Sequence, residues 1–240
     1  MFHPNGPTFF ELAQQALSST ERGYDLLAPK FDYTPFRTPQ FLLDLVRDHL
    51  QKTAPFDRIL DVCCGTGAAM ATLRPLCRRQ VVGIDFSRGM LAVARDRVAS
   101  APGAASTDFV RGDALAMPFG PVFDLAVCFG ALGHILRGDE PRFAAEIVRV
   151  LRPGGRFVFV TSYLPPKRSA RYLLARAFNG AMHVRNLLWR PPFIMYYLTF
   201  LLPEAANLFQ RFGCDIQVET LMSELLSAEY RLVTATRRTG

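Results

Sequence analysis

Two kinds of apolar pattern alternate along this chain. Short, mostly apolar runs predict buried strands, and they occur at 57–62, 80–85, 107–110, 122–129 and 155–162. Runs in which apolar residues recur every three or four positions predict helices, and they occur at 67–77, 87–100 and 139–151. Strands that alternate with helices specify a parallel sheet covered on both faces. We therefore predict an α/β, doubly wound, Rossmann-like fold.

The start of the chain adds helices to this sheet. Apolar residues at helical spacing over Thr8–Ser19 and Pro39–Gln51 predict two helices, with Thr8 and Thr38 as N-caps. We interpret residues 1–52 as a helical lid. A length of 240 residues suits one domain, so we predict that 1–240 is a single domain.

The second half of the chain contains an insert and two further strands. Residues 163–210 form a long, apolar stretch with scattered arginines, in which we expect substrate choice to lie. At 100° per residue these arginines do not gather on one helix face, so substrate cover, dimer contact and membrane contact remain alternatives. Strands are predicted at 214–220 and 228–237, and 221–227 between them is either a connection or a helix.

A glycine turn joins the first strand to the first helix. Gly65 and Gly67 at the end of this strand let a ligand approach the backbone closely. Asp85 ends the second strand, where a carboxylate can accept two hydrogen bonds from a ribose diol. Met70 stands where a dinucleotide-binding motif has its third glycine or alanine. A pyrophosphate site, and with it an NAD-linked oxidoreductase, is therefore disfavoured.

The turn resembles the first motif of class I S-adenosylmethionine (SAM) dependent methyltransferases, an acidic residue followed by alternating glycines. Asp61 is the acid, and Cys63 departs from the motif because it stands at the first glycine position. Segments 111–119, 123–129 and 150–159 resemble later motifs of the family, in the family's order. The resemblance covers about residues 57–162. It implies a seven-stranded, mostly parallel sheet with an antiparallel last strand, and SAM as cofactor.

The resemblance also implies a set of SAM-binding residues at the ends of the strands. Asp85 would bind the ribose, or would simply stabilise a helix N-terminus. Asp61 would contact the SAM amino group or support the glycine loop, and Asp113 would accept from the adenine amino group. A Cβ at Cys63 would lie near the methionine part and weaken affinity. Phe86 would pack on the ribose and adenine, with core packing as the alternative for Phe86 and Met90. The full predicted set is Asp61, Cys63, Gly65, Gly67, Asp85, Phe86, Met90, Asp113, Ala114 and Phe129.

The predicted acceptor side centres on His134, a short loop after the fourth strand. With an ordinary pKa near 6.5, a histidine there can take a phenolic proton at neutral pH. The alternative is a residue that only orients the backbone. Tyr24, Tyr33 and Tyr196 are predicted to contact the acceptor, with ordinary lid packing as the alternative for the first two. Segment 196–203 is loosely similar to the ubiquinone and menaquinone biosynthesis C-methyltransferases.

Composition and charge narrow the remaining classes. Five cysteines without a C-x-x-C pair indicate neither a zinc site nor a disulfide framework, so we expect no metal and a cytoplasmic location. No leader pattern or membrane span is predicted. A net charge of +7 favours anionic partners, but the arginines are spread too widely for a nucleic-acid site. The remaining alternatives for a partner are a membrane that the protein contacts peripherally and a second copy of this chain in a homodimer.

The sequence contains no Ser/His/Asp set, paired acids or metal ligands. Methyl transfer from a sulfonium needs few such groups, because the leaving group is already activated and the enzyme chiefly aligns the reactants. We therefore predict a SAM-dependent methyltransferase that acts on a small, largely apolar acceptor: a quinone-like or polyketide-type aromatic, or a lipid. The alternative is a SAM-binding but inactive methyltransferase-like partner subunit.

Overall fold

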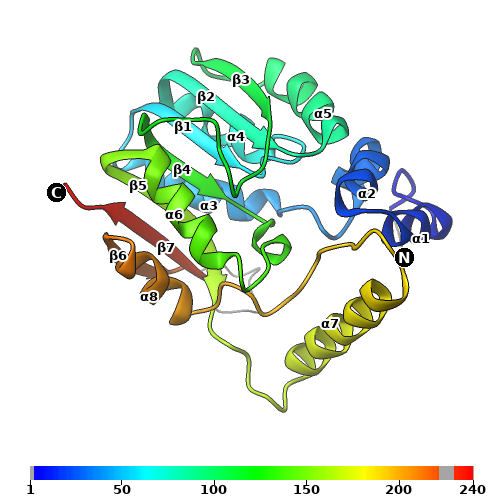
Figure 1. Cartoon of the computed structure of the whole chain (residues 1–240). Helices are drawn as coiled ribbons and strands as arrows, with labels where there is room; N and C mark the ends of the chain where they lie inside the picture. Colours follow the sequence, from blue (N-terminus) through cyan, green and yellow to red (C-terminus); the bar gives the residue numbers. More distant parts are fainter. Residues whose placement is uncertain (1–2, 222–229, 240) are drawn as a thin grey trace.

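The computed structural model describes residues 3–221 and 230–239 and shows a seven-stranded sheet between helices (Figure 1). The strand order is β3-β2-β1-β4-β5-β7-β6. The first five strands run parallel, and β7 lies antiparallel to both of its neighbours. This confirms the doubly wound α/β fold with an antiparallel last strand. The strands are β1 Phe56–Val62, β2 Cys77–Asp85, β3 Ser106–Arg111, β4 Phe123–Cys128, β5 Leu151–Ser162, β6 Cys214–Thr220 and β7 Tyr230–Arg237.

Helices cover both faces of the sheet. Side chains of α6 and α8 pack with one set of strand residues, and those of α3, α4 and α5 pack with the other set. Three short 3-10 helices, η1 Ala28–Tyr33, η2 Arg74–Leu76 and η3 Leu132–His134, lie between the elements. The α-helices are α1 Phe9–Leu17, α2 Thr20–Leu27, α3 Gln40–Gln51, α4 Ala68–Leu73, α5 Arg88–Ala99, α6 Glu140–Val150, α7 Ala170–Leu188 and α8 Glu204–Arg211.

The core lies on both sides of the central strands. Ile59 on β1 faces the α3–α4–α5 layer, and its neighbour Leu60 faces the layer of α6 and α8. Both are fully buried, as expected for successive residues of a strand whose two faces are covered. The short apolar runs of the sequence are therefore explained by burial on both faces. Within the described residues, no helix combines the length and apolarity that crossing a bilayer requires.

Several local predictions differ from the structure, and one of them is the start of β2, which lies at Cys77 instead of residue 80. Three α-helices precede β1 instead of two, because Ser19 caps an additional short helix, α2. The N-cap of α3 is Pro39, without a side-chain hydrogen bond, and Thr38 does not cap it. Helix α4 stops at Leu73 and a 3-10 turn follows. Strand β5 begins at Leu151, four residues before its predicted start at residue 155. All but the first of the residues 221–227, for which a helix was an alternative, lie outside the described residues.

Glycines allow helix α4 to pack closely against its neighbours. Met70 is fully buried against β2, where a Cβ on Gly83 would lie 2.4 Å from the Met70 Sδ. Gly67 has φ +77°, and a Cβ there would lie 2.9 Å from the Cβ of Ala94 on α5. In a dinucleotide-binding motif, a small residue on the helix allows close packing of helix and strand. Here the small residue is Gly83 on the strand, and the Met70 side chain of the helix occupies the space next to it.

Candidate functional site

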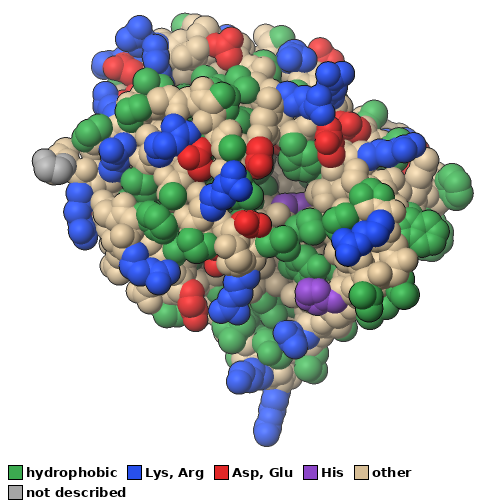
Figure 2. All heavy atoms as spheres, in the orientation of Figure 1, with side chains coloured by type: hydrophobic (Ala, Val, Ile, Leu, Met, Phe, Trp, Pro, Cys, Tyr) green, Lys and Arg blue, Asp and Glu red, His purple; other side chains and the backbone are tan. Residues whose placement is uncertain are grey.

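A cavity of about 450 Å³ lies at the carboxyl ends of β1, β2 and β4, beside residues of α2 and η1. This is the edge of an open parallel sheet at which ligands bind, and the volume suits a small molecule. Figure 2 shows the surface hollowed toward its centre, with a histidine side chain visible inside. Nine of the predicted site residues line the cavity: Tyr24, Asp61, Cys63, Gly65, Asp85, Phe86, Met90, Phe129 and His134.

Asp85 holds the two loops on its side of the cavity together. Its carboxylate accepts hydrogen bonds from the backbone N–H groups of Gly65 and Ser87, each 2.9 Å long. Burial raises the pKa of Asp85, and the two amide donors act in the opposite direction. Each carboxylate oxygen has a second lone pair, so the group can support the loops and still accept from a ligand hydroxyl.

Asp61 is a buried carboxyl group with an unpaired oxygen. It is 2% exposed, and its Oδ2 has no hydrogen-bond partner among the described residues. Burial, together with the charge of nearby Asp85, raises the pKa of Asp61 to about 8, although the backbone amide of Met70 acts against the shift. A buried acid without a partner is costly unless a donor or cation meets it. This oxygen therefore marks a place where a ligand ammonium would be stabilised.

The backbone of the glycine turn is left-handed at three of its positions. Gly65 and Gly67 have φ of +52° and +77°, and a Cβ on Gly65 would meet no atom within 4 Å. Cys63 has φ +57°, a conformation that glycine adopts at lower energy than any L-residue with a side chain. The structure thereby explains why a glycine is expected at position 63. The Cys63 side chain lies at the cavity wall, and its thiol has a raised pKa because it hydrogen-bonds the thiol of Cys128 and is buried.

His134 and Tyr24 form a hydrogen-bonded pair in the wall of the cavity. The Tyr24 hydroxyl lies 2.6 Å from Nε2 of His134, and Nδ1 lies 3.2 Å from the carbonyl oxygen of Ala131. The carbonyl can only accept, so Nδ1 donates to it and Nε2 accepts from Tyr24. Burial lowers the pKa of His134 and raises that of Tyr24. Both groups are therefore neutral at pH 7, and the imidazole is a base.

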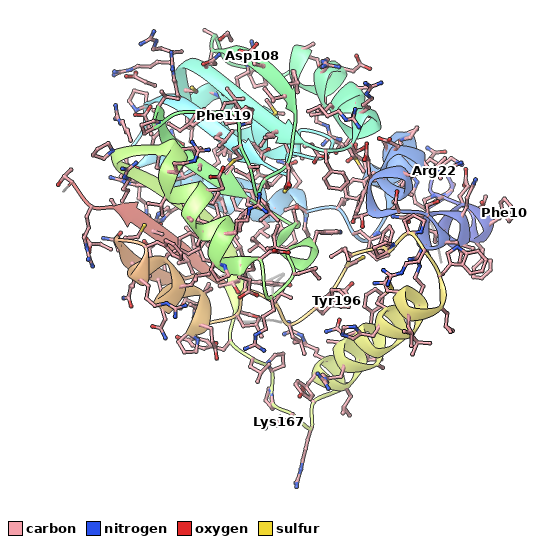
Figure 3. The ribbon with its side chains drawn as sticks, viewed as in Figure 1. Phe10, Arg22, Asp108, Phe119, Lys167 and Tyr196 are labelled. Carbon is pink, nitrogen blue, oxygen red and sulfur yellow. The ribbon has the colours of Figure 1, made fainter. Side chains whose placement is uncertain are left out.

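Five predicted residues lie away from the cavity wall. Gly67 serves the packing of α4 on α5, and Ala114 is buried in the core. Asp113 is exposed, and its Oδ1 accepts from the amide of Leu115 at 2.8 Å. Tyr33 stacks on the ring of His3, and Tyr196 lies between α7 and the sheet (Figure 3), with its hydroxyl 3.1 Å from the Asn186 amide nitrogen. Ligand roles for these five stay predictions.

Two lid carboxylates that the sequence did not single out connect the lid to the ligand-facing loops. Asp25 of α2 accepts from the Ser87 hydroxyl at 2.6 Å and from the Gly89 amide at 2.8 Å. Asp32 of η1 accepts from the Thr66 hydroxyl at 2.8 Å and also pairs with Arg97. Because their partners are distant in sequence, no local pattern could reveal them.

The insert supplies part of the cavity wall. Met195 and Tyr197 line it, whereas the predicted Tyr196 does not. This segment is neither strand nor helix, so no period in the sequence indicates which of the two adjacent tyrosines faces the cavity. Two aromatic residues of the lid, Phe31 and Phe36, also line the cavity.

Comparison with known proteins gives consistent results. The profile of a family described as "Methyltransferase domain" matches residues 59–155. Demethylmenaquinone methyltransferase of Symbiobacterium thermophilum is 37% identical over 121 residues, which are 49% of this chain and 47% of that protein. O-methyltransferase cnsE of Penicillium expansum is 30% identical over 201 residues, covering 75% of this chain and 72% of that protein.

A solved structure shares the fold. It is the magnesium protoporphyrin IX methyltransferase of Synechocystis with bound S-adenosylhomocysteine, with a TM-score of 0.59 at 16% identity and 82% of each chain covered. At that identity the likeness concerns the fold alone. The chain spans about half the length of the first curated relatives that it matches.

Proposed function

Because this chain belongs to the class I SAM-dependent methyltransferases, we propose that it transfers a methyl group from SAM to a small, largely apolar acceptor. The observation that carries the proposal is the unpaired oxygen of Asp61 beside the left-handed backbone of Gly65. The proposal includes a cytoplasmic location, supported by five cysteines that are all free thiols.

The residues of the cavity fit a ligand with an ammonium group at one end and a ribose diol further along. Asp61 would accept from the ammonium, and the free lone pairs of Asp85 would accept from the diol. Phe86 and Met90 line the cavity on the same side as Asp85, where an adenine ring can pack. SAM, when bound, supplies a methyl group on a sulfonium, which is already a good leaving group. The chain has only to align the acceptor and exclude water.

The apolar wall supports an acceptor of aromatic type. Five apolar or aromatic side chains of the lid and the insert line the cavity: Tyr24, Phe31, Phe36, Met195 and Tyr197. Flat apolar rings are held well by such surfaces, because aromatic side chains bury large areas. The demethylmenaquinone methyltransferase relative favours a quinone-like ring among the candidates, with polyketide-type aromatics and lipids as alternatives.

His134 is the base of the proposed reaction. Its Nε2 lone pair is held by the Tyr24 hydroxyl, so a phenolic proton of the acceptor passes to the Tyr24 oxygen as the Tyr24 proton passes to Nε2. The acceptor oxygen, left with the electron pair, would form the new bond to the methyl carbon as the sulfur–methyl bond breaks. If the conjugated carbon forms that bond instead, its ring proton would then be lost to solvent. The hydrogen bond from Nδ1 to Ala131 keeps the imidazole in the required tautomer.

Calorimetry with SAM and S-adenosylhomocysteine tests cofactor binding. We expect micromolar affinity for wild type and a loss of about tenfold or more for Asp61→Asn, through the missing charge-assisted hydrogen bond. Mass spectrometry after incubation with substituted naphthoquinols and phenols then tests transfer. Binding without any methylated product would favour the alternative, an inactive SAM-binding partner subunit. Stabilisation by NAD but not by SAM would overturn the proposal.

A further inference from the structure

Positive charge is concentrated in one segment of the chain. Residues 163–203 contain one lysine, five arginines and no aspartate or glutamate. Their net charge is therefore +6, compared with +7 for the whole chain. Arg185 is held inside the fold by backbone carbonyls. The other five make no ion pair with any described residue: Lys167, Arg168, Arg171, Arg176 and Arg190. Lys167 points into solvent at the start of this segment (Figure 3).

The outward face of α7 is apolar throughout. At 100° per residue, the helix turns Tyr172, Asn179 and Met182 toward the protein. The opposite side consists only of apolar residues and glycine, and the exposed fractions of Leu174, Leu187 and Leu188 are 70%, 79% and 75%. We call this surface the α7 face: Leu173, Leu174, Ala177, Gly180, Ala181, Val184, Leu187 and Leu188.

Helix α1 extends the apolar surface beyond the end of α7. Arg185 joins the two helices, because its guanidinium donates to the carbonyl oxygens of Ala16 at 2.7 Å and Ser18 at 2.8 Å. Phe9 and Phe10 on α1 are 80% and 76% exposed, and Phe10 points away from the protein (Figure 3). Trp189, half exposed at the end of α7, is of the residue type that favours a membrane–water interface.

We propose that the α7 face, together with Phe9 and Phe10, docks on the surface of an anionic phospholipid bilayer. An apolar helix face bordered by arginines is the arrangement that lies in such an interface, with the apolar side chains among acyl chains and the charges near phosphates. A second copy of this chain fits less well, because a symmetric dimer through the same face would bring two sets of unpaired arginines together. Charge complementarity therefore selects the bilayer.

The docked surface is directly connected to the cavity. On the inner side of α7, Asn179 accepts from the backbone N–H of Tyr197 at 2.8 Å and donates to its carbonyl at 2.9 Å. Tyr197 in turn lines the cavity. If the proposed function holds, an acceptor dissolved in the bilayer meets the wall of the site beside the membrane. This consequence rests on the proposed function, whereas the docking rests on the surface alone.

Co-sedimentation with phospholipid vesicles tests the docking without any SAM or acceptor. We expect the full chain to sediment with vesicles of phosphatidylcholine and phosphatidylserine in equal parts, and to bind pure phosphatidylcholine far less. Leu187→Ser/Leu188→Ser should abolish binding. Arg171→Gln/Arg176→Gln should weaken it about fivefold per charge. The matched control Arg78→Gln/Arg79→Gln removes two exposed arginines from β2 and should leave binding within about twofold of wild type.

Three outcomes would overturn the proposal. One is no sedimentation with anionic vesicles. The second is binding that does not depend on the α7 face. In that case Leu187→Ser/Leu188→Ser leaves binding intact, or the α7 arginine variant and the β2 control variant reduce it equally. The third is a dimer in sedimentation equilibrium that the leucine variant dissociates, which would assign the α7 face to a second copy. None of these outcomes depends on SAM binding, so calorimetry separates a failure of the docking from a failure of the proposed function.

Discussion

The glycine-turn region, residues 59–85, and residues 163–203 of the insert place their polar and apolar groups in opposite ways. The glycine-turn region buries Asp61 and Asp85 at a cavity and uses backbone amides to support them. Residues 163–203 expose leucines to solvent, and their basic side chains form no ion pair with an acidic side chain among the residues that the structure describes. The first region is organised around a small ligand. The second exposes apolar side chains next to basic ones, as expected of the proposed docking surface for a bilayer. The predictions below test this division, from the largest expected effect to the smallest.

The largest effect is expected at His134, the proposed base. His134→Ala should lower kcat by roughly 100-fold or more, with SAM affinity unchanged by calorimetry. Tyr24→Phe should lower kcat comparably, and the double variant should lose little more than either single variant, because the two residues act as one relay. Retained turnover in Tyr24→Phe would show that His134 takes the proton directly. Burial lowers the pKa of His134, so the acid limb of the wild-type kcat/KM profile should lie below the ordinary histidine value.

The second prediction concerns pH and Asp61. Its pKa rises on folding from 3.8 to about 8, so the folded protein keeps a proton that the unfolded chain releases. Stability of the ligand-free protein is therefore reduced as pH rises through this window. Asp61→Asn should stabilise the free protein relative to wild type, and more so at about pH 8 than at about pH 5. Denaturant unfolding measures this, with the exposed Asp96→Asn as control. An equal effect at both pH values would contradict the raised pKa.

Two glycine substitutions compare the regions directly. Gly83→Ala should destabilise the protein by about 1–3 kcal/mol, because the new methyl group meets Met70 and Cys64 in a filled core. Met70→Ala in the same chain should recover part of the loss. Gly180→Ala on α7 meets no atom within 4 Å and should stabilise that helix by about 0.5–1 kcal/mol. Thermal unfolding with a double-mutant cycle measures both. Similar effects at the two positions would remove the contrast in packing.

The smallest effect is expected at Cys63. Cys63→Gly relieves a left-handed conformation worth about 1–2 kcal/mol, but it makes the unfolded chain freer by about 0.5–1 kcal/mol. Net stability should therefore change by about 1 kcal/mol or less, while SAM affinity rises a few-fold as the side chain leaves the cavity wall. Cys63→Ala, which keeps a Cβ, is the control. Equal affinities in both variants would show that the Cβ is no obstacle.

The sequence predicted the central strands well because they are largely buried on both faces and glycine stands in the turns beside them, and the mostly exposed edge strand β6 still carries a recognisable strand pattern. Strand β6 was predicted at its observed bounds, and nine of the fourteen predicted site residues line the cavity. The strand follows from the local pattern of residues, whereas the site residues follow from the resemblance to the methyltransferase family. The end of α4 at Leu73 and the start of β5 at Leu151 were predicted less accurately, since the prolines and glycines that follow them fit more than one local structure.

The remaining features depend on contacts between distant segments. Asp25 and Asp32 acquire their roles only when the lid meets the loops after β1 and β2. The choice of Tyr197 over Tyr196 depends on which side of an irregular segment faces the sheet. The arginines of the insert gave no helix-face signal by themselves. The pattern lay in the apolar residues, whose exposure only the folded chain reveals.

The carboxylates of Asp25 and Asp32 hold the first helices to the same loops that carry Gly65 and Asp85. A molecule that stabilises those loops also stabilises the contacts that α2 and η1 make with them, so occupancy of the chamber and the order of α2 and η1 are thermodynamically coupled. An occupied chamber would then protect the amino-terminal segment from proteases. Limited digestion would thereby report, from outside, whether the chamber is filled.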